Sequence, residues 1–404
     1  MIRYSAQAGQ AIKKKRSSRR QALPCTSWQR RRCTLSDLSL PDAAIGGSRI
    51  SAAMKKNRPV PPLVIPIFIP HEGCPHSCLF CNQQRISGVT APPVTTSDVT
   101  EIISTWIRRP GKRHRSRVQV AFYGGSFTCL EMRRQRELLD GVAPFIKSGV
   151  VQEIRLSTRP DYITGKGVAF LRRRHVRVVE LGAQSLDNLV LGKSLRGHSA
   201  EDTIRASELL KKEGMELGLQ LMVGLPEQNF TSLRRTIAQV VRLGPDFVRI
   251  YPVLVVAGSG LALLYRHGEY RPLSLAKAVL LVAWMKKKLM AGGIRVVRMG
   301  LQPGPELEQS LLAGPYHPAF GELVHSRLML QQTRQLLAGI GKNATAILSV
   351  AERDLSVFQG MRRANIERLT SLGLSDRFIL KTDPDQCRGT VRLLEIKQSP
   401  GATG

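Results

Sequence analysis

Short runs of β-branched and apolar residues alternate along this chain with longer stretches in which apolar residues recur at helical spacing. The alternation starts near residue 58 and continues to about residue 300. Each apolar run is followed by a segment long enough to return as a helix, which predicts an α/β fold with a parallel sheet, closed or partly closed into a (β/α) barrel. The predicted strands are 63–69, 118–123, 153–157, 176–181, 217–223, 247–251 and 294–298.

Three of the intervening helices carry recognisable start signals. The predicted caps are Asp98 with Glu101, Ser199 with Asp202, and Ser274. We expect these helices to end near residue 108, at Gly214 and at residues 292–293. After residue 300 the rhythm gives way to Gly- and Pro-rich loops, one long helix over about 319–337, and a mixed tail.

The chain divides into four predicted segments: 1–57, a barrel over 58–300, a C-terminal extension over 301–398, and a frayed tail at 399–404. The first segment has 13 basic and 2 acidic residues and no apolar periodicity. Three interpretations stay open for it: an organelle transit peptide, a basic RNA-binding arm, or an over-extended reading frame whose true start is Met54. The last is favoured, because nothing upstream of Met54 has an apolar face to pack.

Composition narrows the class of protein. Apolar residues make up 42% of 404 residues, which excludes wholesale disorder, and no apolar run is long enough to span a bilayer. We therefore expect no membrane partner. The net charge is +31, from 61 Lys and Arg against 30 Asp and Glu. This excess favours a polyanionic partner such as RNA, although an Arg-rich proteome would produce it too.

Polar and Gly-rich segments follow six of the predicted strands. In a parallel barrel the loops after the strands meet at one rim, where catalytic groups collect. The segments are 71–82, 123–127, 157–161, 180–185, 224–227 and 251–253. This distribution predicts an enzyme.

Three of the seven cysteines lie within eight residues, as Cys74, Cys78 and Cys81. An odd number of cysteines in a long chain does not indicate a secreted disulfide framework, so we expect a cytoplasmic protein with a metal site. Thiolates suit an iron–sulfur cluster or zinc. Three thiolates in one loop can bind three irons of a [4Fe–4S] cluster and leave the fourth iron open. A structural zinc ion would need a fourth ligand, such as His71 or His76.

This cysteine spacing, with Phe80 directly before the third cysteine, resembles the signature of the radical S-adenosylmethionine (SAM) superfamily. Residues 60–300 resemble more closely the radical SAM part of the Elongator catalytic subunit, and several matching segments also recur in oxygen-independent coproporphyrinogen oxidases. The matching segments are Tyr123-Gly124-Gly125-Ser126-Phe127-Thr128, Thr158-Arg159-Pro160-Asp161-Tyr162, Glu180-Leu181-Gly182-Ala183-Gln184-Ser185, Arg196-Gly197-His198 and Ile250-Tyr251-Pro252-Val253-Leu254-Val255.

The resemblance implies a [4Fe–4S] cluster on Cys74, Cys78 and Cys81, together with SAM, which is cleaved reductively to methionine and a 5′-deoxyadenosyl radical. It also implies an electron donor such as flavodoxin or ferredoxin. By the same resemblance Gly124 and Gly125 present backbone to the methionine amino group, and Arg196 binds the carboxylate. The implied SAM contacts are Phe80, which lies against the adenine, Gly124, Gly125, Ser157, Arg159, Gln184 and Arg196.

Three departures from the resembling families limit the functional prediction. Ser157 and Gln220 stand where those families have acidic residues, and no Gly-rich acetyl-coenzyme A motif follows residue 300. We therefore predict a radical SAM enzyme with an unidentified substrate, with tRNA modification slightly favoured. The alternatives are a small metabolite or porphyrin-like substrate, and a non-catalytic RNA-binding protein that carries zinc or a cluster.

Overall fold

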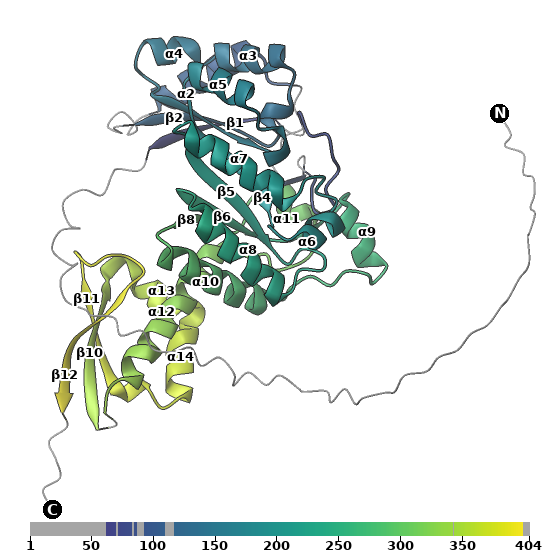
Figure 1. Ribbon diagram of the computed structural model, residues 1–404. Coiled ribbons are helices and arrows are strands. Elements are labelled where there is room, and N and C mark those ends of the chain that lie inside the picture. The colour runs from purple at the N-terminus through teal and green to yellow at the C-terminus, as the bar shows by residue number, and fades with distance from the viewer. Residues whose placement is uncertain are drawn as a thin grey trace, which may run out of the picture. The chain divides into compact units, whose positions relative to one another are not determined.

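Seven parallel strands form one sheet, in the same order in space as along the chain (Figure 1). Strands β1 and β8 are its two edges, so the barrel is partial, and the predicted fold class is confirmed. All seven predicted strands are present: β1 (Leu63–Phe68), β2 (Val118–Tyr123), β3 (Glu153–Thr158), β4 (Val176–Gln184), β5 (Glu216–Val223), β6 (Phe247–Pro252) and β8 (Arg295–Met299).

The computed structural model describes residues 62–69, 72–82, 85–86, 93–109, 117–341 and 343–398. The predictions made for residues 1–57 and 399–404 lie outside these residues, as does His71. The division of the chain at residue 300 stays a prediction. No helix in the described residues is long and apolar enough to cross a membrane.

The helices between the strands begin close to the predicted positions. Ser199 and Asp202 form a capping box, and Ser274 caps its helix, as predicted. The prediction for Asp98 is wrong: Thr95 is the cap, and Asp98 is the third helical residue that bonds back to it. The helices are α2 (Thr96–Arg108), α3 (Met132–Asp140), α4 (Ala143–Lys147), α5 (Gly165–Arg173), α6 (Asn188–Lys193), α7 (Ala200–Lys212), α8 (Phe230–Leu243), α9 (Gly260–Arg266), α10 (Leu275–Ala291) and α11 (Pro305–Ser310).

The main core lies between the sheet and these helices. Alternate strand residues such as Ile65, Val120, Leu156 and Leu219 point into it and are almost fully buried. The residues between them point to the other face of the sheet, where several are charged or polar. The sheet therefore separates an apolar layer under the helices from a polar interior.

The tail that the sequence left unspecified forms a second sheet of three strands, in the order β11-β10-β12. Strand β10 (Ala344–Ala351) pairs in parallel with β11 (Phe378–Asp383) and antiparallel with β12 (Val391–Gln398). The predicted long helix is α12 (Phe320–Ala338), which contacts α10 and covers this sheet with α13 (Leu355–Gln359) and α14 (Ala364–Ser371). A short ribbon pairs β7 (Val255–Val256) with β9 (Leu311–Ala313).

Candidate active site at the carboxyl ends of the strands

The rim formed by the carboxyl ends of the strands holds several residues in unusual backbone conformations. Gln184 at the end of β4, Leu195 and Glu227 are non-glycine residues with φ of 64°, 50° and 60°. Such conformations cost free energy, and they persist where the surrounding structure needs them, often in binding sites. Three other non-glycine residues with positive φ, His175, Arg362 and Arg363, lie elsewhere, so the side chains at the rim must decide its role.

The cysteine loop leaves the end of β1 and crosses this rim. Cys78 is buried, Cys81 is half-buried and Cys74 is exposed. The Cys81 N–H donates to the Cys78 carbonyl at 3.0 Å, which closes a turn between the second and third cysteines. The three predicted ligands therefore lie in one loop, and a turn brings the second and third close together.

Distant segments hold the cysteine loop in place. The Leu79 N–H donates to the Ser194 carbonyl at 3.2 Å, and the Leu261 N–H donates to the Leu79 carbonyl at 2.7 Å. The Asn82 side-chain amide donates to the Ala257 carbonyl at 3.2 Å. The loop is therefore fixed by the segments that follow β4 and β6, which belong to other parts of the rim.

Arg196 joins the cysteine loop to strand β4. Its Nη1 lies 3.3 Å from Cys78 Sγ, while its Nε and Nη2 donate to the Gly182 carbonyl at 3.2 and 2.7 Å. The residue is only 8% exposed. A charged side chain therefore lies directly beside one of the three predicted cluster ligands. Sequence reasoning placed Arg196 in the site but did not foresee its contact with a cysteine.

Two glycines allow this close packing. Gly197 has φ of 72°, and a Cβ built on it would lie 2.6 to 2.7 Å from ring atoms of His76 in the cysteine loop. A Cβ built on Gly125 would lie 2.4 Å from the Glu72 carbonyl oxygen and 2.6 Å from that of Ile69. In this structure the need for glycine at both positions comes from the approach of the cysteine loop.

Gln184 presents a buried polar atom that the protein does not satisfy. Its side-chain Oε1 has no hydrogen-bond partner among the described residues. A buried amide oxygen without a partner is costly, so such a group at a rim indicates a position for a ligand donor. Gln184 is one of the predicted SAM contacts, and its assignment stays a prediction.

The other predicted SAM contacts lie at the same rim, with varied surroundings. The buried Arg159 donates from Nε and Nη2 to both carboxylate oxygens of Asp161 at 3.0 Å. Ser157 is half-buried opposite Glu180, and Phe80 packs against the apolar cluster around Leu261. The SAM contacts of Arg159, Ser157 and Phe80 stay predictions.

Two thiols at the rim, Cys74 and Cys129, have raised pKa values. Cys74 is exposed on one side, but the protein around it still partly desolvates its thiol. Burial raises the pKa of Cys74, against the opposing effect of the nearby Arg196 charge. Burial also raises the pKa of Cys129 to about 11, and its Sγ lies 2.9 Å from Ser126 Oγ. Cys129 therefore behaves as a hydrogen-bonded neutral thiol.

Glu180 is a buried charged residue below the rim, and the sequence analysis did not single it out. Glu180 on β4 lies 3.4 Å from Arg155 Nη1 and 3.1 Å from Arg249 Nε, and it accepts a hydrogen bond from the Tyr123 hydroxyl at 3.2 Å. Arg249 Nη2 also donates to that hydroxyl at 3.0 Å. The signal available was one acidic residue within the apolar strand β4. Tyr123 directly precedes Gly124. The hydrogen bonds of its hydroxyl to Glu180 and Arg249 therefore help to hold the segment that contains Gly124 and Gly125.

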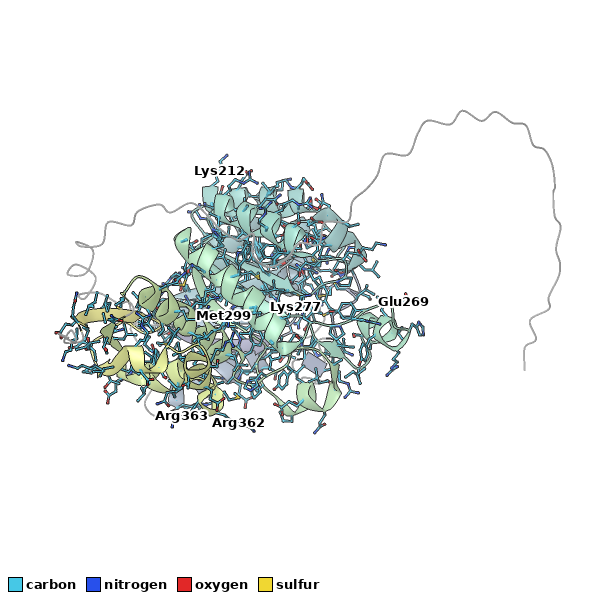
Figure 2. All side chains as sticks on the ribbon, turned by 90° about the horizontal axis from the view of Figure 1, so that it is seen from below. Lys212, Glu269, Lys277, Met299, Arg362 and Arg363 are labelled. Atoms are coloured by element: carbon cyan, nitrogen blue, oxygen red, sulfur yellow. The ribbon has the colours of Figure 1, made fainter. Side chains whose placement is uncertain are left out.

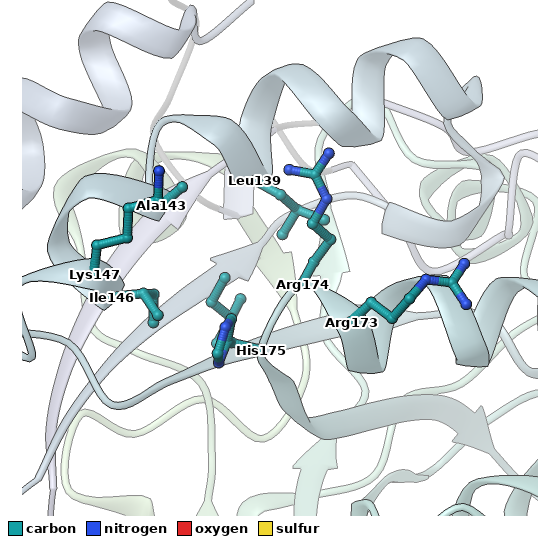
Figure 3. Close-up of a pocket in the computed structure, with 8 residues that line it drawn as sticks. Leu139, Ala143, Ile146, Lys147, Arg173, Arg174 and His175 are labelled. Carbon is teal, nitrogen blue, oxygen red and sulfur yellow. The ribbon is translucent and has the colours of Figure 1, made fainter.

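The basic run Arg172-Arg173-Arg174, a further candidate for phosphate contacts, lies at the opposite edge of the sheet. Each helix ends where the next strand begins, so the run 172–174 at the end of α5 lies at the amino ends of the strands. Lys147, Arg173, Arg174 and His175 line a cavity of about 180 Å³ there (Figure 3). Arg172 and Arg174 already pair with Glu213 and Asp140. These side chains cannot border a substrate bound at the cysteine loop.

Two protein-family models match the chain, and both agree with the three clustered cysteines of the site. Residues 68–240 match the family model of the Radical SAM superfamily, and residues 245–330 match that of the Radical_SAM C-terminal domain. Together the two matches cover more than half of the chain. The chain belongs to the radical SAM superfamily. The prediction of a radical SAM enzyme is thereby confirmed, whereas its substrate and the ligands of its cluster are not tested.

Curated relatives of this radical SAM protein include enzymes named for tRNA. It is 33% identical over 147 residues to a tRNA uridine(34) acetyltransferase of Methanocaldococcus infernus, a match that covers 36% of this chain and 27% of the relative. It is 30% identical over 136 residues to Elongator complex protein 3 of Mus musculus, covering 32% of this chain and 24% of the relative. The chain thus matches about a quarter of these relatives' length.

A solved structure shares the fold. Archaeal Methanocaldococcus infernus Elp3 with an N-terminal deletion superimposes with a TM-score of 0.54 at 21% sequence identity, covering 71% of this chain and 70% of that one. At this identity the likeness supports the partial-barrel fold and not a particular reaction.

The residues present fit the cofactors of the superfamily. Three sulfur donors share one loop, a guanidinium lies beside one of them, and an unsatisfied amide oxygen lies at the neighbouring strand end. In the described part of the chain, no three His, Cys, Asp or Glu side chains converge on a point where one metal ion could bind. A four-iron cluster takes one thiolate on each of separate irons, and three thiolates in one loop are a donor set that suits it.

Proposed function

We propose that this protein holds a [4Fe–4S] cluster through Cys74, Cys78 and Cys81, cleaves SAM, and modifies an RNA, with tRNA as the substrate class. When bound, the cluster supplies the electron for reductive cleavage of SAM. The observation that carries the proposal is Arg196, which contacts Cys78 Sγ at 3.3 Å and the Gly182 carbonyl at 2.7 Å. One charged side chain thus connects the cysteine loop with the strand end that bears Gln184.

The chain's own residues would bind and orient SAM. Arg196 can offer a charge-assisted hydrogen bond to the methionine carboxylate without leaving the rim. Gln184 Oε1, which has no partner in the described structure, can accept a hydrogen bond from SAM. Gly124 and Gly125 would present backbone groups to the methionine amino group. Phe80, Ser157 and Arg159 complete the proposed set of contacts.

Exposed basic side chains near the rim that holds the cysteine loop support an RNA substrate. Arg234 and Arg235 lie in the second turn of α8, which follows the loop after β5, and Arg235 lies 3.8 Å from Asp187. Lys277 lies in the first turn of α10 (Figure 2). Lys212 lies at the other end of the sheet, where α7 ends. Such cations can contact phosphates next to the cysteine loop, which the basic run at the opposite edge cannot. The name of one curated relative, a tRNA uridine(34) acetyltransferase, points to the same substrate class.

A reducing compartment suits this chemistry. We propose that the protein works in the cytoplasm, where thiols stay reduced, and receives single electrons from a donor such as flavodoxin or ferredoxin. Because the chain matches only about a quarter of the tRNA uridine(34) acetyltransferase, acetyl transfer is not part of the proposal.

The test is anaerobic reconstitution followed by incubation with SAM and a reductant, with and without total tRNA. The expected protein holds about four irons per chain and forms 5′-deoxyadenosine faster when tRNA is present. Cys74→Ala, Cys78→Ala and Cys81→Ala should each abolish the iron. Unchanged iron in any of the three variants would refute the ligand assignment. Iron and SAM cleavage without stimulation by tRNA would instead indicate a small-metabolite substrate.

A matched pair of variants separates RNA recognition from nonspecific charge. Reversal of Arg234 and Arg235 to Glu should weaken tRNA binding and lower the log–log salt slope by roughly 0.7–0.9 for each phosphate that the protein no longer neutralises. The control reverses Arg172 and Arg173 at the opposite edge and should leave tRNA-stimulated SAM cleavage intact. Equal losses in the two variants would mean that tRNA does not bind at the rim.

A further inference from the structure

The second sheet ends in an exposed edge strand, β12. Strand β12 is eight residues long, and every residue after Val391 is exposed. Three of these are large and apolar: Leu393, Leu394 and Ile396 are 37%, 55% and 48% exposed. In the described part of the chain, β10 is the only strand that pairs with β12. Long apolar edge strands readily pair with another strand, and proteins usually shield them.

A bulge gives this strand an unusual arrangement of faces. Ile347 of β10 lies opposite Glu395, but the next residue, Leu348, lies opposite Leu393, so Leu394 is an extra residue. Residues directly opposite each other share a face of a sheet. Val391, Leu393 and Ile396 therefore share the face of the buried Ala346, Leu348 and Val350, while Arg392 and Glu395 share the other face.

This arrangement makes the edge complementary to itself. When two copies of β12 run antiparallel about a twofold axis, residues that lie opposite each other must share a face of the joined sheet. The ladder with β10 establishes a shared face for Arg392 with Glu395 and for Val391 with Ile396. In one register Arg392 lies opposite Glu395 of the second copy, and Val391 lies opposite Ile396. Symmetry produces each pair twice. In a strand without the bulge, Arg392 and Glu395 would lie on opposite faces and could not meet.

We propose that β12 pairs with β12 of a second copy of this chain, so that the two three-stranded sheets join into one six-stranded sheet. Neither Arg392 nor Glu395 has an ion-pair partner within the described residues, so both are available for the pairing. The other edge strand, β11, is less suitable, because Pro384 directly follows it and lacks the N–H that a longer ladder needs. The partner is therefore a second copy of this chain, joined through strand β12.

Sedimentation equilibrium of the full chain tests the proposal through charge reversal. The wild-type protein should show a concentration-dependent dimer in the micromolar range. Arg392→Glu or Glu395→Arg alone creates two like-charged pairs across the twofold axis, so each should weaken dimerisation roughly ten- to hundredfold. The double variant Arg392→Glu/Glu395→Arg restores both pairs with reversed polarity and should recover most of the wild-type affinity.

The control places the same charge reversal on the other edge, as Lys381→Glu on β11, which should leave dimerisation unchanged. A wild-type protein that stays monomeric at about a hundred micromolar would overturn the proposal. So would a dimer that the single reversals do not weaken, or a double variant no better than the single ones. A dimer that disappears on deletion of residues 1–53 would assign the contact to that segment and also overturn it. Iron content and SAM cleavage provide separate readouts of the proposed catalytic function.

Discussion

Replacement of Glu180 by Gln tests whether the buried charges below the rim depend on one carboxylate. Glu180 is 2% exposed and is the only acidic group of the described residues that pairs with Arg155 and Arg249. The Nε of Arg155 already lacks a hydrogen-bond partner there. The Gln side chain keeps the shape and one acceptor but removes the charge, which leaves two guanidinium groups close together without an anion.

The magnitude follows from the burial of the group. Removal of one partner from a buried ion pair typically costs 3–5 kcal/mol, because a charge is left uncompensated in a poorly solvated place. For a protein of this size that corresponds to a decrease in Tm on the order of 4–7 °C. Circular dichroism during urea and thermal unfolding measures both quantities. The free energy of unfolding should fall by at least about 3 kcal/mol.

The matched control is Glu216→Gln on the neighbouring strand β5. Glu216 pairs with Arg295 at 3.1 Å, but the two side chains are 25% and 64% exposed. An exposed pair contributes about 1 kcal/mol or less, so this variant should unfold nearly as the wild-type protein does. If Glu180→Gln lost no more stability than Glu216→Gln, the two buried arginines would not need the carboxylate and the reasoning would be wrong.

Three further changes test other features of the site and its surroundings. Gly197→Ala should lower the yield of reconstituted cluster, measured as iron per chain, because its methyl group would displace His76 and the cysteine loop; full iron loading would contradict this role. Cys129→Ala should leave the iron content unchanged, and a loss of iron would show that a fourth cysteine binds the cluster. Burial and the Lys286 charge lower the pKa of His325 to about 4. Between about pH 6.5 and 4 the imidazole is therefore protonated in the unfolded chain but neutral in the folded chain. Stability should therefore fall as the pH drops from about 6.5 to 4, and urea titrations should show a smaller fall for His325→Gln.

Local patterns in the sequence were sufficient for the elements of the barrel and for the family. All seven strands formed where short apolar runs predicted them, because the apolar and β-branched residues that fit a buried strand are consecutive in the sequence. The caps at Ser199 and Ser274 were predictable for the same reason, since a cap involves residues only three positions apart. The cysteine spacing, with the segments that follow the other strands, was enough to indicate a radical SAM enzyme.

Contacts between distant residues were decided only by the tertiary structure. Arg196 meets Cys78 across 118 positions, and Arg249 meets Tyr123 across 126. No local pattern encodes such distances, because they depend on how the sheet curls and on which loops meet at the rim. The same holds for the basic run 172–174. Its charge is plain in the sequence, but the direction of α5 places it at the edge away from the cysteines.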